Sequence, residues 1–513
     1  MTLRGSNGVA FGPDGRLYVA EFLAGRISAV DLATGDVEPI VPPGGPIQAP
    51  DDLAFDSSGA MVVTDLVPGR VWRRAPDGTF TLVADGIRAP NGIACADGRL
   101  FVNEMVPGGR LLELTAGRPV VLATGLAMGN AMQVGPDGCL YYPHMLTGEI
   151  YRLPLAGSSA PELVTQVDQP VAVRFDRAGL LHVLSRDAAG TVTVIGDDGR
   201  TVLTTGVIGI DNGAVDDENR IFVSSYARGG ITELLPGGRT REIVPPGLCG
   251  PFGVTIDLAG KVHAADHYRM ITADGGTTEL HTFAHGIAAD GDELHLTSQF
   301  GQIKTYHRGS RQVRTRASGL DQPGSVCVRR AHELIVAESG AGRVIAVDAA
   351  DRVTVLAEGL GLPTGLAVDA AGRVHVSDEE RGAVYRLDDD GPFLITDGLD
   401  TPQGLAIDGD DLLIVETGRR RLLAVGLPAP RTGGDVRAPA SGPARPGLRV
   451  LADDLPVGLP PREQPALFAE GLPGLPGVPR PFAGLAVADD GTIHLAADGE
   501  GRVLQIRTGD PDT

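Results

Sequence analysis

The chain has 513 residues, of which 72 are Gly and 38 are Pro, and charged residues make up only 21%. This composition favours many short strands joined by tight turns over long helices. The 65 acidic residues outnumber the 44 Lys and Arg, and the net charge of -21 repels nucleic-acid phosphates and anionic lipid. We therefore expect no nucleic-acid partner and no membrane partner.

The N-terminal residues lack the apolar core of a secretory signal, and no stretch approaches the roughly 20 apolar residues of a membrane-spanning helix. These features predict a cytoplasmic protein. The four cysteines, Cys95, Cys139, Cys249 and Cys327, are far apart and show no C-x-x-C spacing. Neither a disulfide framework nor a thiolate zinc site is indicated.

One repeated phrase organises the chain. The segment NGVAFGPDGRLYVAE at 7–21 returns in altered form along the sequence, in steps of 33 to 44 residues except the last. The later units begin at Asp51, Asn91, Asn130, Val171, Asn212, Phe252, His285, Gly324, Thr364, Gln403 and Ala483. The last step is 80 residues long and contains a Pro- and Gly-rich insertion at about 427–481.

Each unit is typical of four short antiparallel strands. In the first unit an apolar strand is followed by a D-G turn, an alternating strand around 17–19, a third strand at 26–31 and a fourth at 37–41. Four strands in about 40 residues make one propeller blade, and twelve blades exceed the roughly 4 to 8 of a single ring. We predict an all-β chain of twelve four-stranded blades forming two six-bladed β-propellers, at 1–247 and 248–513.

The last unit ends after a third strand at 503–507, so its fourth strand must come from elsewhere. Residues 2–4 could supply it, and the two rings would then share a chain crossing. The simple six-plus-six split and this interleaved arrangement both remain open.

The unit pattern is clearest in PTGLAVDAAGRVHVSDEERGAVYRL, from Pro363. It resembles NHL-repeat propellers, the gluconolactonase and senescence-marker-protein superfamily, and virginiamycin B lyase. The resemblance covers nearly the whole chain and implies the propeller fold. It does not imply one reaction, because the superfamily includes lactonases, phosphotriesterases, lyases, condensing enzymes and binding scaffolds.

The residue before each apolar inner strand is expected at the mouth of the central channel. In the first half five of these six residues are Asn or Asp, whereas the second half has neither. Their oxygens suit Ca²⁺ or Mg²⁺. The candidate metal ligands are Asn7, Asp51, Asn91, Asn130 and Asn212. Alternatively, each Asn satisfies local backbone groups at a turn.

The resemblance implies a similar site. Gluconolactonase-like proteins hold one divalent ion with a Glu, two Asn and an Asp from the starts of inner strands. Asn91, Asn130 and Asn212 match in type, and Asp51 offers the carboxylate. Asn7 stands where the family has its Glu, which is a departure from the pattern. The expected cofactor is one divalent cation, Ca²⁺ or Mg²⁺.

A second polar ring is expected at the end of each second strand. In the first half it comprises Glu21, Asp65, Glu104, His144, Ser185 and Ser225. We predict His144 as the catalytic base, with Glu21, Asp65 and Glu104 as further catalytic candidates. In virginiamycin B lyase-like chemistry a His and a Glu act with a metal that polarises a carbonyl.

The acids also have a structural interpretation. Glu21, Asp65 and Glu338 each precede an Arg by five residues, and Glu104 precedes Arg110 by six. Such carboxylate and guanidinium pairs could join strand two to strand three in each blade. In the fourth unit Glu149 stands in place of the Arg, so His144 could pair with it or be an ordinary surface histidine.

Large apolar residues follow the second strand in the first half. They are Phe22, Leu66, Met105, Met145 and Tyr226, with Arg186 in the remaining position. Methionine adapts to irregular apolar ligands, so we expect a bulky apolar small-molecule substrate. The predicted substrate-binding residues are Phe22, Met105, Met128, Met132, Met145 and Tyr226. Ordinary packing at the top of each blade is the alternative.

Two classes of function follow. One is a divalent-metal-dependent hydrolase or lyase acting on an apolar lactone, ester or other product of secondary metabolism, with an isomerase or cyclase as a variant. The other is a non-catalytic NHL-type scaffold that binds a protein or peptide. The Asn and Asp ring favours the enzyme. We expect the second half, with His267, Tyr268 and His285 as a vestigial site, to support the first.

Overall fold

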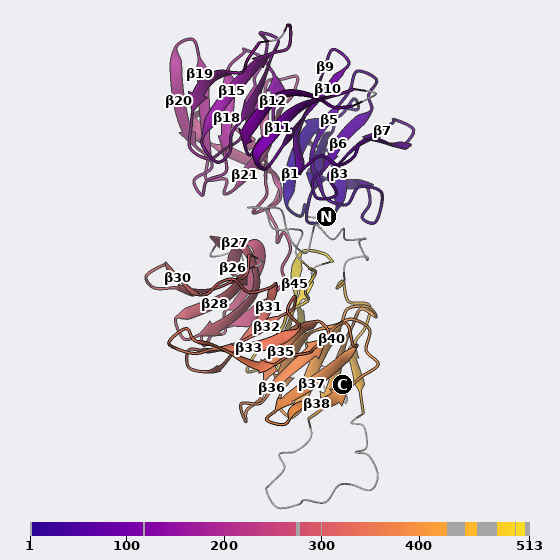
Figure 1. Cartoon of the computed structure of the whole chain (residues 1–513), viewed down its shortest axis with the longest axis vertical. Coiled ribbons are helices and arrows are strands. Elements are labelled where there is room, and N and C mark those ends of the chain that lie inside the picture. The colour runs from indigo at the N-terminus through magenta and orange to yellow at the C-terminus, as the bar shows by residue number, and fades with distance from the viewer. Residues whose placement is uncertain are drawn as a thin grey trace, which may run out of the picture. The chain divides into compact units, whose positions relative to one another are not determined.

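The computed structural model describes residues 3–115, 118–157, 159–272, 278–298, 300–427, 447–458, 480–497 and 499–507. Within these ranges the regular secondary structure is β-strand except for one helical element, the short η1 (Pro236–Gly238) (Figure 1). No helix in the described chain is long and apolar enough to cross a membrane. The described residues divide into two compact units, one of 3–249 and one of 250–458 with 480–507.

Six four-stranded antiparallel sheets form the first unit. Each contains four strands consecutive in the chain. The strands are β1 (Ser6–Phe11), β2 (Leu17–Glu21), β3 (Arg26–Val30), β4 (Val37–Val41), β5 (Pro50–Phe55), β6 (Met61–Asp65), β7 (Arg70–Arg74), β8 (Phe80–Ala84), β9 (Pro90–Ala96), β10 (Arg99–Glu104), β11 (Pro107–Leu114), β12 (Val120–Ala127), β13 (Gln133–Val134), β14 (Cys139–Pro143), β15 (Glu149–Pro154), β16 (Glu162–Gln166), β17 (Pro170–Phe175), β18 (Leu181–Ser185), β19 (Thr191–Gly196), β20 (Gly199–Thr204), β21 (Ile210–Val215), β22 (Ile221–Ser225), β23 (Ile231–Leu234) and β24 (Thr240–Val244).

The described part of the second unit has one six-stranded sheet, three four-stranded sheets and one three-stranded sheet. Their strands, in chain order, are β25 (Val254–Ile256), β26 (Val262–Thr272), β27 (Thr278–Asp290), β28 (Glu293–Ser298), β29 (Gln302–His307), β30 (Gln312–Ala317), β31 (Pro323–Arg330), β32 (Glu333–Glu338), β33 (Arg343–Val347), β34 (Val353–Ala357), β35 (Pro363–Val368), β36 (Val374–Asp378), β37 (Ala383–Asp388), β38 (Gly391–Thr396), β39 (Pro402–Asp408), β40 (Asp411–Glu416), β41 (Arg421–Gly426), β42 (Arg449–Ala452), β43 (Leu485–Val487), β44 (Ile493–Ala497) and β45 (Arg502–Ile506).

The six-stranded sheet departs from the prediction of twelve separate four-stranded blades. It combines the seventh and eighth repeats. In the first repeat four residues separate β2 from β3, whereas in the seventh only His267 and Tyr268 lie between the corresponding residues, Asp266 and Arg269. The strand β26 runs without a break through His267, whose φ is 50°, and β27 runs without a break through Phe283, whose φ is 64°. Asp266 Oδ2 accepts a hydrogen bond from Arg269 Nε at 2.7 Å across this shortened connection.

The last sheet has three strands among the described residues, as predicted. The alternative in which residues 2–4 complete it is wrong for Leu3 and Arg4, which lie in no strand. Leu3 packs instead with Val9 and Leu17 of the first sheet, and Thr2 lies outside the described residues. Within the Pro- and Gly-rich insertion, 428–446 and 459–479 are also outside them. The segment between these ranges includes β42, which pairs with β41.

Apolar cores lie between neighbouring sheets. In the first unit one core joins Phe222 and Ile231 of the sixth sheet to Val9 and Leu17 of the first. The inner strands contact one another in the cyclic order β1, β5, β9, β13, β17, β21 and back to β1, and those of the second unit in the order β25, β27, β31, β35, β39, β43 and back to β25. Each sheet therefore buries its apolar surface only against its neighbours.

The inner strands approach most closely near their starts. A Cβ atom added at Gly92 would lie 2.2 Å from the carbonyl oxygen of Asn130, and one added at Gly404 would lie 2.1 Å from that of Ala483. Only glycine permits such a close backbone approach. In each unit this convergence brings the starts of six inner strands together around one axis.

Candidate functional site

Strand pairing defines the equivalent positions at this convergence in the first unit. Gly213 pairs with Val223, which is two residues before the end of β22. In the first sheet, the β1 residue that pairs with the corresponding position of β2, two residues before its end, lies two positions after Asn7. Asp211, rather than the predicted Asn212, is therefore the counterpart of Asn7. The equivalent residues are Asn7, Asp51, Asn91, Asn130, Val171 and Asp211.

Asp52 and Asn212 occupy the next position along their strands, where β1 and β9 have Gly. The Asp52 carboxylate accepts hydrogen bonds from Asn212 Nδ2 at 2.9 Å and from the backbone N–H of Ile93 at 3.2 Å. The second and sixth sheets are not neighbours in the cyclic order. Both flank the first sheet, so the bond between Asp52 and Asn212 spans that sheet at the starts of the inner strands.

A buried guanidinium lies beside this bond. Arg174, on β17, donates hydrogen bonds to Asn212 Oδ1 and to the carbonyl oxygen of Gly213. It also donates to the carbonyl oxygens of Met132 at 3.2 Å and of Val173 at 2.7 Å. Arg174 thus links the fourth, fifth and sixth sheets at the axis.

Three carboxyl groups lie close enough here to influence one another. Burial and, to a smaller extent, the Asp52 carboxylate raise the pKa of Asp211 to about 7, although Arg186 and Arg174 oppose the increase. Burial, with the charges of Asp211 and Asp52, also holds the pKa of Asp51 well above its ordinary value. The cluster therefore favours protonation unless another cation joins it.

Two amide oxygens of the site are buried without a hydrogen-bond donor, Asn7 Oδ1 and Asn91 Oδ1. The Nδ2 of Asn91 is engaged, because it donates to Asp51 Oδ1 at 2.7 Å. An unpaired buried oxygen costs free energy, and a hard cation would satisfy it. Asn7, Asp51 and Asn91, with Asp211 nearby, fit a divalent cation.

The two other predicted ligands use their amide oxygens within the protein. Asn130 Oδ1 accepts a hydrogen bond from the N–H of Ala131 at 2.7 Å, and Asn212 Oδ1 accepts from Arg174 and from the N–H of Gly213. Among the described residues no group of three or more His, Cys, Asp or Glu could hold a metal ion. A cation at the axis would therefore depend on asparagine oxygens.

Methionine sulfurs border the polar cluster. Met105 Sδ lies 3.0 Å from Asn91 Nδ2 and 3.5 Å from Asn130 Nδ2. Met145 Sδ lies 3.7 Å from Asn130 Nδ2 and 3.4 Å from Arg186 Nη1. Both side chains are almost fully buried. These two predicted substrate-binding residues therefore lie directly at the cluster.

The other predicted substrate-binding residues are placed differently. Tyr226 lies under Arg186, whose Cζ is 5.2 Å from the ring centroid. Phe22 and Met128 are buried, and Met132 belongs to the core between the third and fourth sheets. Of these four, Tyr226 contacts the polar cluster through its ring beside Arg186, and Met132 contacts it through its carbonyl oxygen, which accepts a hydrogen bond from Arg174.

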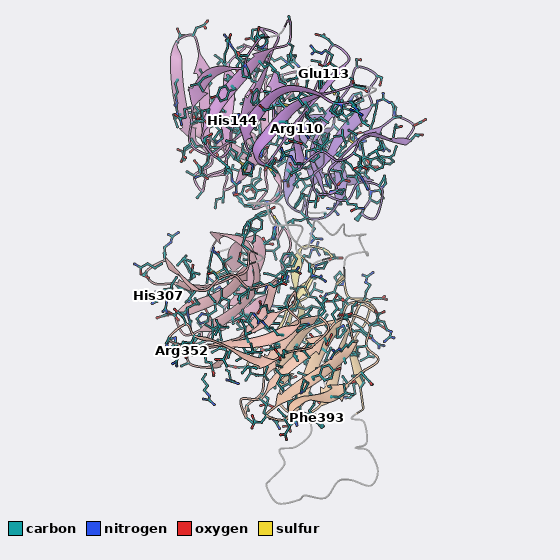
Figure 2. The ribbon with its side chains drawn as sticks, in the orientation of Figure 1. Arg110, Glu113, His144, His307, Arg352 and Phe393 are labelled. Atoms are coloured by element: carbon teal, nitrogen blue, oxygen red, sulfur yellow. The ribbon has the colours of Figure 1, made fainter. Side chains whose placement is uncertain are left out.

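Glu21 and Glu104 each form an ion pair with an arginine of the next strand in the same sheet. Glu21 Oε1 accepts hydrogen bonds from Arg26 Nε at 2.7 Å and from Ser28 Oγ at 2.6 Å. Glu104 Oε2 accepts from Arg110 Nε at 3.0 Å, and Figure 2 labels Arg110 on the first unit. The predicted pairing of strand two with strand three is confirmed for both acids. Their catalytic role stays a prediction, and these contacts do not favour it.

Asp65 does not form the predicted ion pair with Arg70. Its Oδ1 accepts hydrogen bonds from the N–H groups of Ala49 at 2.7 Å and Gln48 at 3.1 Å. Among the described ion pairs, Arg70 is paired with Asp85 at 3.6 Å rather than with Asp65. The predicted pair is wrong because the aspartate side chain is one methylene shorter than glutamate. Burial consequently raises the pKa of Asp65 to about 6.

This raised pKa predicts a pH effect on stability. Because the pKa of Asp65 is higher in the folded chain than the roughly 3.9 of an unfolded one, its contribution to stability falls as pH rises from about 4 to 6 and stays low above. We expect Asp65→Asn to remove about 2 kcal/mol of this fall in the free energy of unfolding. Denaturant unfolding at pH 4.5 and 7.5 measures it, with exposed Asp85→Asn as the control. Equal pH dependence in Asp65→Asn and the wild type would contradict the assignment.

His144 directly follows β14 and is labelled in Figure 2. Its ring lies 4.7 Å from that of Tyr151, and its Nδ1 is 3.9 Å from Glu149 Oε2. Burial lowers the pKa of His144, opposed by Glu149, and its Nε2 is buried without a hydrogen-bond partner. Met145, the next residue, is the one that contacts Asn130. A neutral imidazole is therefore available, but its role as the base stays a prediction.

Sequence reasoning did not select Asp52, Asp211, Arg174 or Arg186. Each nevertheless interrupts the repeat pattern. Asp52 replaces the usual Gly, Arg174 stands where four other inner strands of the unit have Ala, and Arg186 is the charged residue in an otherwise apolar series. Asp211 was hidden because the Asn-Gly pair at 212–213 imitates that at 7–8 with a shift of one residue.

The convergence in the second unit is aromatic rather than acidic. The ring of His285 stacks on Phe252 at 5.1 Å and on Phe482 at 5.4 Å. Burial lowers the pKa of His285 to about 4 and that of His267 to about 3. These imidazoles are therefore neutral near pH 7, and Tyr268 lies against His267 at 4.1 Å.

No family model matches the chain. A gluconolactonase of Zymomonas mobilis subsp. mobilis is 33% identical over 118 residues, which are 19% of this chain and 33% of that protein. The chain resembles the gluconolactonase-like β-propellers. This confirms the resemblance predicted from the repeats. The match spans about a third of the length of that gluconolactonase.

Solved structures with similar architecture have diverse titles. A streptogramin B lyase is 18% identical with a TM-score of 0.40, covering 52% of this chain and 91% of its own. Regucalcin of Agrobacterium tumefaciens, titled a calcium-binding protein, is 16% identical with a TM-score of 0.38, covering 44% and 83%. A chain of the nidogen/laminin complex is 18% identical with a TM-score of 0.38, covering 43% and 88%. Similarity at this level carries no information about what the present chain does.

Proposed function

We propose that the first unit is a six-bladed β-propeller enzyme, a divalent-metal-dependent hydrolase or lyase that acts on a bulky apolar metabolite with a lactone, ester or similar carbonyl group. The second unit is a second six-bladed propeller that supports it. The observation that carries the proposal is the convergence of Asp51, Asp52 and Asp211 with the unpaired oxygens of Asn7 and Asn91. Buried like charges and unpaired oxygens are costly without a ligand and mark functional sites.

Asn7, Asp51 and Asn91 would hold the cation, Ca²⁺ or Mg²⁺, through their hard oxygens. When bound, such an ion supplies a Lewis acid for a substrate carbonyl oxygen. Asp52 has a different part, because its carboxylate is held by Asn212 and by the N–H of Ile93. It fixes the geometry of the axis rather than facing a ligand.

Asp211 is the proton acceptor of the proposed reaction. No described hydrogen bond holds its carboxylate, and its pKa of about 7 is close to the value that suits a general base near neutral pH. Taking a proton from water leads to hydrolysis, and taking one from the carbon next to the carbonyl leads to elimination. The same residues serve both reactions.

Met105, Met145 and Tyr226 would contact the apolar body of the substrate. The two sulfurs lie within 3.7 Å of the Asn91 or Asn130 amides, so a molecule reaching the polar cluster would touch them. Their flexible thioethers adapt to irregular apolar shapes and displace water from the cluster.

Metal titration tests the proposal. Chelator-treated full-length protein should take up one Ca²⁺ or Mg²⁺ ion, and its affinity should rise with pH, because the pKa of Asp51 is raised and its proton must leave before a cation binds. Asp51→Asn should weaken binding by about 10- to 100-fold, a loss typical of a damaged metal site. Exposed Asp85→Asn should leave it unchanged.

Two outcomes would contradict the metal proposal. One is the absence of stoichiometric uptake after reconstitution. The other is an affinity that Asp51→Asn does not alter. Turnover without any metal dependence would leave a propeller enzyme of another class, and neither turnover nor metal uptake would favour a binding scaffold.

A further inference from the structure

The residues that directly follow the second polar ring (Glu21, Asp65, Glu104, His144, Ser185 and Ser225) are apolar or aromatic in every sheet of the first unit but one. Arg186 occupies this position in the fifth sheet, between Met145 of the fourth sheet and Tyr226 of the sixth. Met145 Sδ and the Tyr226 ring are its neighbours, at 3.4 Å from Nη1 and 5.2 Å from Cζ. A single cationic side chain therefore interrupts the apolar border of the proposed site.

The guanidinium of Arg186 has few acceptors within the protein. It forms no ion pair with a carboxylate of the described chain, and its one hydrogen bond there is to the weakly accepting sulfur of Met145. Arg174, in contrast, donates to four oxygens. A guanidinium has five N–H donors, and Arg186 is half-buried, so most of them are available to a ligand.

A purely structural role explains Arg186 less well. Its charge lowers the pKa of Asp211, so the two groups are near each other, yet no salt bridge joins them. The buried counter-charge of the axis is already supplied by Arg174, which acts on both Asp52 and Asp211. An arginine with a structural role in this protein forms a close ion pair, as Arg26 does with Glu21, where Nε and Oε1 are 2.7 Å apart.

A surface hollow begins beside this residue. It has a volume of about 390 Å³, and both apolar and polar residues line it: Met145, Leu146 and Val167 on the one hand, and Thr147, Gln166, Asp168, Gln169 and Arg200 on the other. The backbone N–H of Arg186 donates to the carbonyl oxygen of Gln169 at 3.0 Å, so the hollow adjoins the fifth sheet at this point. The apolar part of this lining, Met145, Leu146 and Val167, could contact a short apolar chain whose charged end lies at Arg186.

We propose that Arg186 binds an anionic oxygen group of the substrate, a carboxylate or a phosphate. The substrate would then be an amphipathic anion, with its apolar body on Met105, Met145 and the adjoining hollow. This inference rests on the proposed function, since it names the substrate class of the same site. The planar fork of arginine suits two oxygens of one such group and excludes a neutral molecule of similar shape.

Binding of three probes with the same chain length tests this. Octanoate, octyl phosphate and octan-1-ol are titrated into the full chain by calorimetry, with and without Ca²⁺. The wild type should prefer an anionic probe over octan-1-ol by about 10- to 100-fold, as expected for charge-assisted hydrogen bonds. Arg186→Met, which keeps apolar bulk, should lose the preference, and Arg186→Lys should keep part of it. Arg177→Met, an exposed arginine paired with Asp217, is the matched control.

The outcomes separate this inference from the proposed function. A preference that needs Arg186 but no Ca²⁺, in a chain that takes up no metal, would support the anion site and overturn the metal proposal. Metal uptake with equal binding of the three probes would overturn the anion site alone. An unchanged preference in Arg186→Met, or no binding of any probe to the wild type, would also overturn it. The stronger of the two anionic probes identifies the group.

Discussion

Asp211→Asn is expected to lower turnover by about 10²- to 10⁴-fold, the usual contribution of a positioned base. The substitution keeps the size of the side chain but removes the carboxylate that accepts the proton. Metal uptake should be retained, because Asn7, Asp51 and Asn91 remain. In the wild type, turnover should rise with pH as the Asp211 carboxyl, with its raised pKa, becomes ionised.

His144→Ala is the informative comparison. If the sequence-based prediction is right, this variant will show the large loss and Asp211→Asn a small one. If the axis is the reaction centre, the order is reversed, because His144 faces Tyr151 and Glu149. His285→Ala, in the second unit, should have little effect on turnover. Equal losses in all three variants would contradict both assignments.

Arg174→Met is expected to destabilise the first unit by about 3 to 5 kcal/mol, the range found when one partner of a buried charge network is removed. The carbonyl oxygens of Gly213 and Met132 would lose their donor, and the buried Asp52 would lose the nearby positive charge that lowers its pKa. The midpoint of urea unfolding, followed by tryptophan fluorescence at Trp72, reports the loss.

Arg177→Met again serves as the control, because its guanidinium is exposed and pairs with an exposed Asp217. It should change the free energy of unfolding by less than about 1 kcal/mol. Adding Asp52→Asn to Arg174→Met should recover part of the stability, since it removes the uncompensated charge. A single variant Arg174→Met that unfolds with the wild-type midpoint would show that the axis does not depend on this network.

The sequence alone determined the features that depend on neighbouring residues. The alternation of apolar residues and the turn residues of each repeat specify the strands. The struts of Glu21 with Arg26 and of Glu104 with Arg110 could also be predicted, because adjacent strands of one hairpin place these residues opposite each other. Local spacing was not sufficient for Asp65, whose shorter side chain leaves Arg70 to Asp85.

Only the tertiary structure decided the chemistry of the axis. Asp52 and Asn212 are 160 residues apart, and they meet because the six sheets of the first unit close into a ring. Whether an asparagine oxygen is free to bind a cation depends on such contacts between sheets. The Oδ1 atoms of Asn7 and Asn91 have no hydrogen-bond donor, whereas that of Asn212 accepts a hydrogen bond from Arg174. The pairing register, rather than the repeated Asn-Gly, places Asp211 among the carboxylates. Each of these facts depends on contacts between sheets, and the pattern of a single repeat carries no information about its neighbours across the axis.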